Sequence, residues 1–407
     1  MAILFGSGKK LFTDDGIPYM WQSGDVTTTP SASDVMSYSS GAVGDQFGES
    51  VAVGSGRIVV GDAYKDFGSN GDQGLAHIFD LNGNVTTLWI AASDGAAGDG
   101  FGNSVAVGSG RIVVGARLDD VGINTNQGSA YIYDLDGNNE VKITASDGAA
   151  YDYFGKSVAV GHQKIVVGAD QKNGAGIIRG AAYIYDLDGT QVGILTGDDS
   201  NFDKFGSSVA VGSGRIVVGA TGAGSDPSNR GAAYIYDLDG NNEIKITASD
   251  GDTYDEFGIS VAVGSGRIVV GADSVDVGIN TSQGAAYIFD LDGNQLSKIT
   301  ASDGAAYDYF GASVAVGSGR IVVGARGVDI GSNTFQGAAY VYDLDGNLIK
   351  KITDPNGNAS DQFGESVAVG SGRIVIGSPG DGIGGTAHLY DTPLVYNLYD
   401  AIDLNYK

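Results

Sequence analysis

The chain has 407 residues, with 68 glycines, six prolines and no cysteine, and its formal net charge is −26. The absence of cysteine excludes disulfides and thiolate metal sites, and the acidic charge argues against nucleic acid as a partner, because a phosphate-binding surface needs a basic patch. No stretch is long and apolar enough to span a membrane, so we expect no membrane insertion.

Residues 1–32 precede the first repeat of the chain. Their short apolar run lies before the lysines of MAILFGSGKK, which is not the order of a secretory signal, so we expect no cleavable signal at this end. We expect residues 1–32 to be an N-terminal docking extension in which Phe5, Tyr19 and Trp21 pack on the protein's own surface or on a partner subunit.

From residue 47 onwards seven Phe-Gly dipeptides recur at regular intervals of 51 to 54 residues. The repeats begin near Phe47, Phe101, Phe154, Phe205, Phe257, Phe310 and Phe363. Seven units of nearly constant length indicate a repeat architecture.

Each repeat is predicted to form four short strands. The first two, such as SVAVG and RIVVGA, are joined by Gly-Ser-Gly; a variable loop leads to a third strand such as AAYIYDLDG, and a fourth such as NEVKITAS follows. Valine, isoleucine and tyrosine dominate these runs, glycine, asparagine and aspartate separate them, and no segment predicts an amphipathic helix.

One four-stranded unit cannot bury both faces of its sheet, so neighbouring units must stack. The sequence therefore predicts an all-β fold, a seven-bladed β-propeller of four-stranded antiparallel blades over residues 33–391. A β-solenoid is the alternative, although its coils are usually much shorter.

The seventh repeat lacks a fourth strand of its own. Residues 33–48 align with residues 140–155 when both are counted back from Phe-Gly, which places Met36 where Ile143 lies. We expect residues 33–38 to complete the last blade and so to close the ring. Residues 392–407 form a C-terminal tail, in which Tyr396, Tyr399 and Tyr406 are further candidates for docking.

In such a blade the turns between strands 1 and 2 and between strands 3 and 4 lie on one side of the disc, here called the turn face. Its composition hardly varies, and we expect arginines of the first turn to pair with aspartates of the second; the arginines are Arg57, Arg111, Arg215, Arg267, Arg320 and Arg373. We interpret this face as structural.

The loops between strands 2 and 3 and the connections between blades lie on the opposite side, here called the loop face. The 2–3 loops vary most between repeats, although those of repeats two, five and six share a core of Val or Ile followed by Gly-x-Asn-x-x-Gln-Gly, and variable loops on a rigid scaffold often carry recognition. The candidate partner-binding residues are Tyr64, Lys65, Asp66, Phe67, Arg117, Asp119, Asp120, Asn124, Lys172, Arg179, Asp226, Arg230, Asp276, Asn280, Asp329 and Phe335.

An aspartate lies two positions before every Phe-Gly. The seven are Asp45, Asp99, Asp152, Asp203, Asp255, Asp308 and Asp361. We expect them to cap the following turns by accepting backbone N–H groups; the alternative is a contribution to cation sites with neighbours such as Asp147 or Asp303.

Phe-Gly, the apolar strand pair and the closing Gly-Ala resemble FG-GAP repeats over roughly residues 34–391, and Gly377-Ser378-Pro379 is similar to the full Gly-Ala-Pro. The resemblance implies the seven-bladed propeller of integrin α-subunits, adhesion or protein–protein binding and, in many members, calcium. The calcium loop of that family lies in the 1–2 hairpin and is rich in carboxylates. Here the hairpin is Gly212-Ser213-Gly214-Arg215, and the other six are no better, so we expect no cofactor and no metal site.

We also expect no enzymatic activity. His77, His162 and His388 occur at what look like unrelated repeat positions, and no Gly-x-Ser-x-Gly motif is present. A carbohydrate-active enzyme is the less favoured alternative.

The sequence favours a structural or binding propeller of a virion, such as a capsid-decoration, tail or fibre protein, with a marine bacteriophage as one source. Its partners would be proteins of an assembly, a surface glycan, or both. The alternative is a secreted or cell-surface adhesin.

Overall fold

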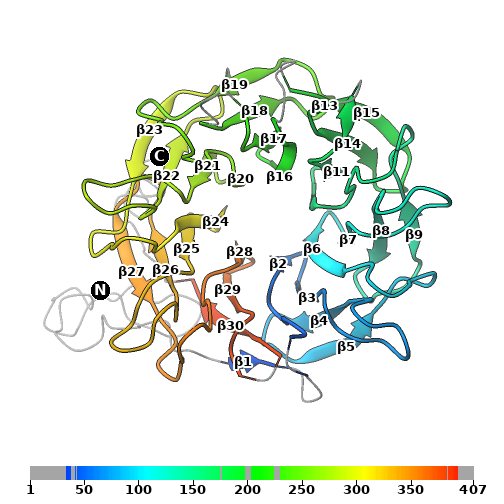
Figure 1. The fold of residues 1–407 in the computed structure, drawn as a ribbon, viewed down its shortest axis with the longest axis horizontal. Coiled ribbons are helices and arrows are strands. Elements are labelled where there is room, and N and C mark those ends of the chain that lie inside the picture. The colour runs from blue at the N-terminus through cyan, green and yellow to red at the C-terminus, as the bar shows by residue number, and fades with distance from the viewer. Residues whose placement is uncertain are drawn as a thin grey trace, which may run out of the picture.

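The computed structural model describes residues 34–37, 42, 44–174, 177–197, 203–223, 230–382 and 384–392. The strands form seven four-stranded antiparallel sheets arranged as blades around a ring (Figure 1). None of these residues belongs to a helix that could cross a membrane. The fold predicted from the repeats is confirmed. The predicted docking residues Phe5, Tyr19, Trp21, Tyr396, Tyr399 and Tyr406 lie outside the described part of the chain.

Each blade has an inner pair of strands joined by a tight turn. The inner pairs are β2 (Val51–Gly54) and β3 (Arg57–Asp62), β6 (Phe101–Gly108) and β7 (Arg111–Ala116), β10 (Ser157–Gly161) and β11 (Lys164–Ala169), β16 (Phe205–Gly212) and β17 (Arg215–Ala220), β20 (Ser260–Gly264) and β21 (Arg267–Ala272), β24 (Phe310–Gly317) and β25 (Arg320–Ala325), and β28 (Val367–Gly370) and β29 (Arg373–Ser378). In blade 4, Gly212 pairs with Arg215, and Ser213 and Gly214 have φ values of 47° and 74°. Two consecutive positive φ values are typical of a two-residue type I′ turn, which explains the Gly-Ser-Gly motif.

A third and a fourth strand complete each blade on its outer side. They are β4 (Leu75–Asp80) and β5 (Val85–Ile90), β8 (Ser129–Asp134) and β9 (Val141–Ile143), β14 (Ala181–Asp186) and β15 (Gln191–Leu195), β18 (Ala232–Tyr236) and β19 (Ile244–Ile246), β22 (Ala285–Phe289) and β23 (Gln295–Ile299), β26 (Ala338–Tyr342) and β27 (Leu348–Ile352), and β30 (Thr386–Asp391) and β1 (Asp34–Met36). A short hairpin of β12 (Asn173–Gly174) and β13 (Ile177–Ile178) lies in the 2–3 loop of blade 3.

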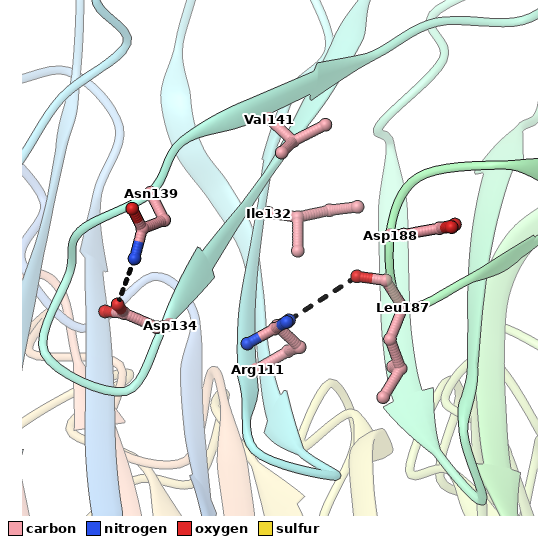
Figure 2. A pocket seen from close by; sticks show the side chains of 7 residues that line it. All are labelled: Arg111, Ile132, Asp134, Asn139, Val141, Leu187 and Asp188. Atoms are coloured by element: carbon pink, nitrogen blue, oxygen red, sulfur yellow. Dashed lines mark hydrogen bonds between the residues drawn. The ribbon is translucent and has the colours of Figure 1, made fainter.

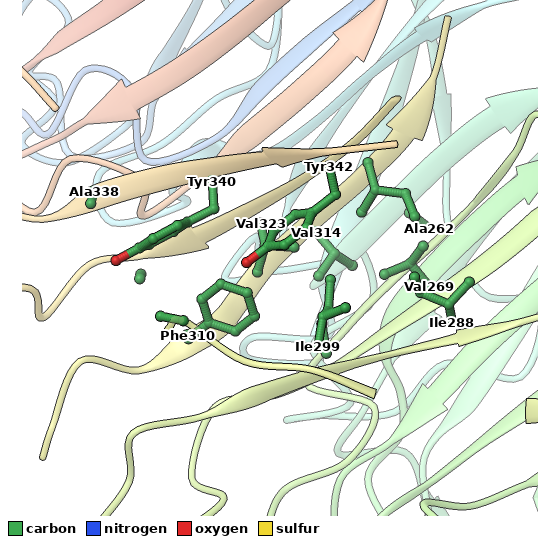
Figure 3. Packing of buried hydrophobic residues seen from close by; sticks show 14 of the residues in the cluster. Ala262, Val269, Ile288, Ile299, Phe310, Val314, Val323, Ala338, Tyr340 and Tyr342 are labelled. Atoms are coloured by element: carbon green, nitrogen blue, oxygen red, sulfur yellow. The ribbon is translucent and has the colours of Figure 1, made fainter. Parts of the chain in front are cut away.

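The hydrophobic core lies between the blades. In one cluster, Val269 and Ile288 of blade 5 face Phe310 and Tyr340 of blade 6 (Figure 3). Because each sheet packs against a neighbour on both sides, its middle strands are buried along their whole length, as the third strand of blade 4 shows. Stacking therefore supplies the core that one blade alone could not form.

Phe-Gly is the junction between consecutive blades. The ring of Phe101 is fully buried and packs edge-on against Tyr131, with the two ring centroids 5.4 Å apart. Gly102 has a φ of 99°, and a Cβ at this position would lie 2.3 Å from the carbonyl oxygen of Leu75 in blade 1. The junction requires glycine both for its backbone conformation and for this close approach.

The N-terminal strand closes the ring in the last blade, as predicted. Met36 pairs with Ala387 of β30 and its side chain is 3% exposed. At the inner side, the Ser366 hydroxyl donates a hydrogen bond of 2.7 Å to the Gly48 carbonyl of blade 1. Ser50 makes the same bond to Gly102 between blades 1 and 2, so the closing junction repeats the internal ones.

Candidate binding face formed by the loops

On the turn face, polar side chains link each blade to the next. The Arg57 guanidinium of blade 1 lies 2.8 Å from Asp136 Oδ1 of blade 2 and donates through Nε to the Leu135 carbonyl. The same pairing joins Arg215 to Asp292 at 3.7 Å and Arg267 to Asp345 at 3.5 Å. The predicted arginine–aspartate pairing is confirmed for these three arginines.

A groove of about 360 Å³ lies on the turn face between blades 2 and 3 (Figure 2). Its lining residues are Arg111, Ile132, Asp134, Asn139, Val141, Leu187 and Asp188. Arg111 donates to the Leu187 carbonyl, Asn139 donates to Asp134, and Asp188 accepts the Thr190 N–H. Because these polar groups have partners within the protein, the candidate binding site is the loop face and not this groove.

On the loop face, four 2–3 loops share the same arrangement of nine residues, here called the frame, which comprises residues 120–128 in blade 2. In blade 2, Val121 and Asn124 pair through both backbone hydrogen bonds, and Asp120 Oδ1 accepts the Asn126 N–H at 2.7 Å. The Asn124 side chain donates to Gln127 Oε1 at 2.7 Å and to the Gly148 carbonyl at 3.3 Å. These bonds fix the loop to itself and to the connection that follows the blade.

The frame recurs in blades 5 and 6, as their shared sequence core suggests, and also in blade 1. There Phe67 pairs with Asn70, and Asp66 accepts the Asp72 N–H. The sequence comparison missed blade 1 because Phe67 replaces the aliphatic residue of the other loops and Gly71 replaces a threonine.

Six of the predicted binding residues hold these frames together through their side chains. They are Asp66, Asp120, Asn124, Asp276, Asn280 and Asp329. Their side chains hold the loops by hydrogen bonds within the protein. A further role in binding a partner stays a prediction.

Other predicted residues lie in internal contacts at the base of the loops. Asp119 is buried and contacts Lys142 at 2.7 Å. Lys65 pairs with Asp45 at 2.6 Å, Lys172 with Asp152 at 3.1 Å, and Phe67 packs edge-on against Trp89.

The remaining candidates are more exposed or undescribed. Tyr64, Arg117 and Arg179 are half-buried, Arg230 is exposed and Phe335 is 43% exposed. Asp226 lies outside the described residues.

The loop tips carry exposed apolar side chains that the sequence analysis did not select. Ile123 and Ile279 follow the glycines of the two-residue turns in blades 2 and 5 and are 99% and 97% exposed. Tyr151 and Tyr307, in the adjacent connections between blades, are 56% and 51% exposed, and each N–H bonds to the neighbouring loop. The available signal was an isoleucine after glycine in the motif Val-Gly-Ile-Asn.

Acidic groups at the base of the loop face have raised pKa values. Burial raises the pKa of Glu49 to about 7, with Glu365 and Asp62 adding to the rise and Arg117 and Lys156 opposing it. Burial also raises the pKa of Asp99 and of Asp273 to about 6. A raised pKa can suit a general acid, but the groove described above lies on the opposite face.

The aspartates before Phe-Gly act as caps. Asp99 Oδ2 accepts the N–H of Ala96, three residues earlier. Asp45, Asp152, Asp255, Asp308 and Asp361 do the same. Capping is therefore confirmed for these six, with the correction that the capped turn precedes the aspartate, because the connection folds back before it enters the next blade.

Two of the three histidines occupy one repeat position, so the prediction of unrelated positions is wrong for them. His77 pairs with Val60 in blade 1 and His388 with Ile376 in blade 7, as Tyr131 pairs with Val114 in blade 2. The His77 and His388 rings pack edge-on against the phenylalanines of Phe-Gly, with centroids 5.2 and 5.0 Å apart.

Comparison with known proteins agrees with this architecture. The FG-GAP repeat model matches residues 88–133, 138–185, 189–236, 241–289, 294–342 and 347–390. Each match runs from the outer strand of one blade to the third strand of the next.

One solved structure similar to this chain is the β-propeller domain of the Trilobed protease from Pyrococcus furiosus, which is described as having an open velcro topology. It is 12% identical, with a TM-score of 0.54, and the match covers 89% of this chain and 98% of that one, which shows a likeness of fold alone. No curated protein matches the sequence. Because the repeat model covers well over half of the residues, the chain belongs to the FG-GAP repeat family.

Proposed function

We propose that this chain is a non-enzymatic binding propeller that attaches to a protein partner through its loop face. The observation that carries the proposal is the pair of loop tips, at which Ile123 and Ile279 are almost fully exposed on loops held by internal hydrogen bonds. A rigid loop loses little conformational freedom on binding, so most of the gain from burying its apolar side chain is retained.

Exposed aromatic groups in the connections between blades support a protein interface. Tyr151, Tyr254 and Tyr307 are between 51% and 62% exposed, and tyrosine is enriched at the centres of protein interfaces. Glycans also stack on aromatic rings, but the fully exposed isoleucines favour a protein surface.

The setting that we propose is a virion, in which the loop face would contact a neighbouring protein or the host surface. A cell-surface adhesin is the alternative setting. Mass spectrometry of purified particles tests this assignment: the chain should be present in virions, and its recovery in a cell-surface fraction alone would support the adhesin.

The binding role is tested first by identifying the partner. A photo-crosslinking amino acid replaces Ile123, and the protein crosslinked to it during assembly in the source cells is the partner. The affinity of the purified partner is then measured for the Ile123→Asp/Ile279→Asp double variant. We expect binding to weaken roughly 10- to 100-fold, while the melting temperature stays within about 1 °C, because both side chains are in solvent.

Leu296→Asp is the matched control, because Leu296 is 52% exposed on the outer strand β23. It should bind normally. Undiminished binding of the double variant would contradict the proposal, and turnover of any glycan in a panel would contradict the non-enzymatic part of it.

A further inference from the structure

In four of the seven blades a lysine lies beside the tyrosine of the third strand, and in two others a lysine contacts the aspartate before Phe-Gly. In blades 2, 4, 5 and 6 the lysine is on the outer strand and its Nζ lies 5.2 to 5.4 Å from the ring centroid of that tyrosine; the lysines are Lys142, Lys245, Lys298 and Lys351. In blades 1 and 3, Lys65 and Lys172 come from the 2–3 loop. In blade 2, Lys142 lies between two carboxylates, at 2.6 Å from Asp94 and 2.7 Å from Asp119.

Blade 7 has no lysine, and its two carboxylates are Asp381, at the position of Asp119, and Asp354, at a different position from Asp94. Val35 of β1 lies opposite His388, in the register in which Lys142 lies opposite Tyr131. Asp381 follows β29 by three residues, as Asp119 follows β7. Instead of an ammonium group, this blade brings an imidazole to the place where the carboxylates meet.

The three side chains converge. His388 Nε2 lies 3.8 Å from Asp354 Oδ2 and 3.8 Å from Asp381 Oδ2, and all three donor atoms lie within 4.8 Å of one another. Asp354 and His388 are 6% and 2% exposed, and Asp381 is somewhat more exposed. In a tetrahedral site with bonds of about 2.0–2.1 Å, ligand atoms are about 3.4 Å apart. The two distances of 3.8 Å from His388 Nε2 therefore need to shorten only slightly.

Thr386 holds two of the three donor atoms, because its hydroxyl donates to Asp381 Oδ2 at 2.8 Å and lies 3.0 Å from His388 Nε2. Asp354 Oδ1 accepts the Asn356 N–H, but Oδ2, which faces the imidazole, accepts no hydrogen bond from the described residues. A buried carboxylate oxygen without a hydrogen-bond donor is unfavourable, and a cation bound beside Asp354 Oδ2 would satisfy it.

We propose that Asp354, Asp381 and His388 bind a divalent transition-metal ion, with Zn²⁺ as the principal candidate. One imidazole and two carboxylates suit Zn²⁺, whereas Ca²⁺ takes only oxygen ligands. The ion would join the connection between β27 and β28, the 2–3 loop of blade 7, and the strand that pairs with β1. It would thereby fasten the blade in which the ring closes, with water in the fourth position.

The first test uses the full chain freed of metal with EDTA and then desalted. Titration with Zn²⁺ should show one equivalent bound, and Co²⁺ should give the visible absorption of a tetrahedral site. At about 100 times the Kd, Zn²⁺ should raise the melting temperature by roughly 3–5 °C, whereas Ca²⁺ should not.

Two variants restore residues that the other blades carry at the same positions, so they should fold. His388→Tyr restores the tyrosine that blade 2 carries at this position. Asp354→Ala restores the alanine of blade 5, because Asp354 and Ala301 each lie two positions after a paired isoleucine. Each should lose the Co²⁺ absorption and the rise in melting temperature. His77→Tyr, the same exchange in blade 1, should keep both.

Absence of stoichiometric Zn²⁺ binding to the native chain would overturn the proposal, as would unchanged affinity in both His388→Tyr and Asp354→Ala. Circular dichroism in EDTA shows whether each variant is folded; if one is not, the other decides. An equal rise in melting temperature with Ca²⁺ would overturn the assignment to a transition metal.

Discussion

On the turn face, Asp134 accepts backbone N–H groups from its own turn, and these bonds, led by that from Asn138, hold the pKa of its carboxyl below the usual value. On the loop face, Asp99 and Asp273 are buried, and burial raises their pKa values to about 6. The two faces thus contain the same kind of residue in opposite electrostatic environments.

The difference shows why charged residues alone do not locate a binding site in this protein. The arginines and aspartates of the turn face connect blades, and the polar residues of the loop frames connect each loop to itself. What remains for a partner is the apolar tip, at Ile123 and Ile279. The two faces therefore differ most in what they leave exposed.

The largest expected effect concerns a glycine at the base of the loop face. In Gly155→Ala the new Cβ would lie 2.3 Å from the Ser129 carbonyl oxygen, at a φ of 90°. The backbone of the neighbouring blade cannot move aside easily, so we expect a loss of roughly 3 kcal/mol or more in the free energy of unfolding. Thermal or urea unfolding measures it.

Gly110→Ala is the matched control on the turn face. Gly110 has a similar φ of 77°, but its Cβ would meet open space, so the cost should be only about 1–2 kcal/mol. Equal losses in the two variants would show that the faces do not differ in their tolerance of side chains.

A smaller effect, of the opposite sign, is expected at the inner side of the loop face. Glu49 has a folded-state pKa of about 7, above its ordinary 4.5, so the folded state binds this proton more tightly than the unfolded state. Stability should therefore fall as the pH rises from about 4.5 to 7. Glu49→Gln removes this ionisation and should stabilise the protein by roughly 1–3 kcal/mol at pH 8.

At pH 5 the gain from Glu49→Gln should largely disappear, because the native glutamate is then mostly protonated. Melting temperatures of both proteins at pH 5 and pH 8 provide the test. A gain independent of pH would mean that the ionisation of Glu49 is not its source.

The smallest expected effect is on the turn face. Arg57→Ala removes a partly exposed ion pair with Asp136 and a hydrogen bond to the Leu135 carbonyl. We expect a loss of about 0.5–1 kcal/mol, which decreases in 1 M NaCl. A loss above about 2 kcal/mol would place the arginines of this face among the main stabilising contacts of the ring.

The fold could be predicted from the sequence because the same pattern of strands and turns occurs in seven repeats. Phe-Gly marked each junction, the Gly-Ser-Gly turn marked six of the seven inner hairpins, and the alignment of Met36 with Ile143 gave the closing strand. Each of these signals is local, and repetition separated it from chance.

The candidate sites were harder to predict, because they depend on what the loops expose and on what the fold brings together. Asp120 and Asp276 were chosen because they lie in variable loops, but their carboxylates accept hydrogen bonds inside the loops. Ile123 is exposed because Val121 pairs with Asn124 and leaves Ile123 in a two-residue turn, and the structure was needed to show this pairing. His388 lies close to Asp354 in the fold, but the two residues are too far apart in the sequence for one short motif to contain both.

The closing strand also has a consequence for synthesis of the chain. β1 is translated first and its partner β30 last, and the closing contact between Ser366 and Gly48 joins positions 318 residues apart. At ordinary rates of translation, β1 must wait roughly 18–70 s before β30 has been synthesised. Closure is also a contact of long range, and among the described residues three backbone pairs join β1 to β30. We therefore expect blade 7 to form last during folding and to open first when the native ring fluctuates.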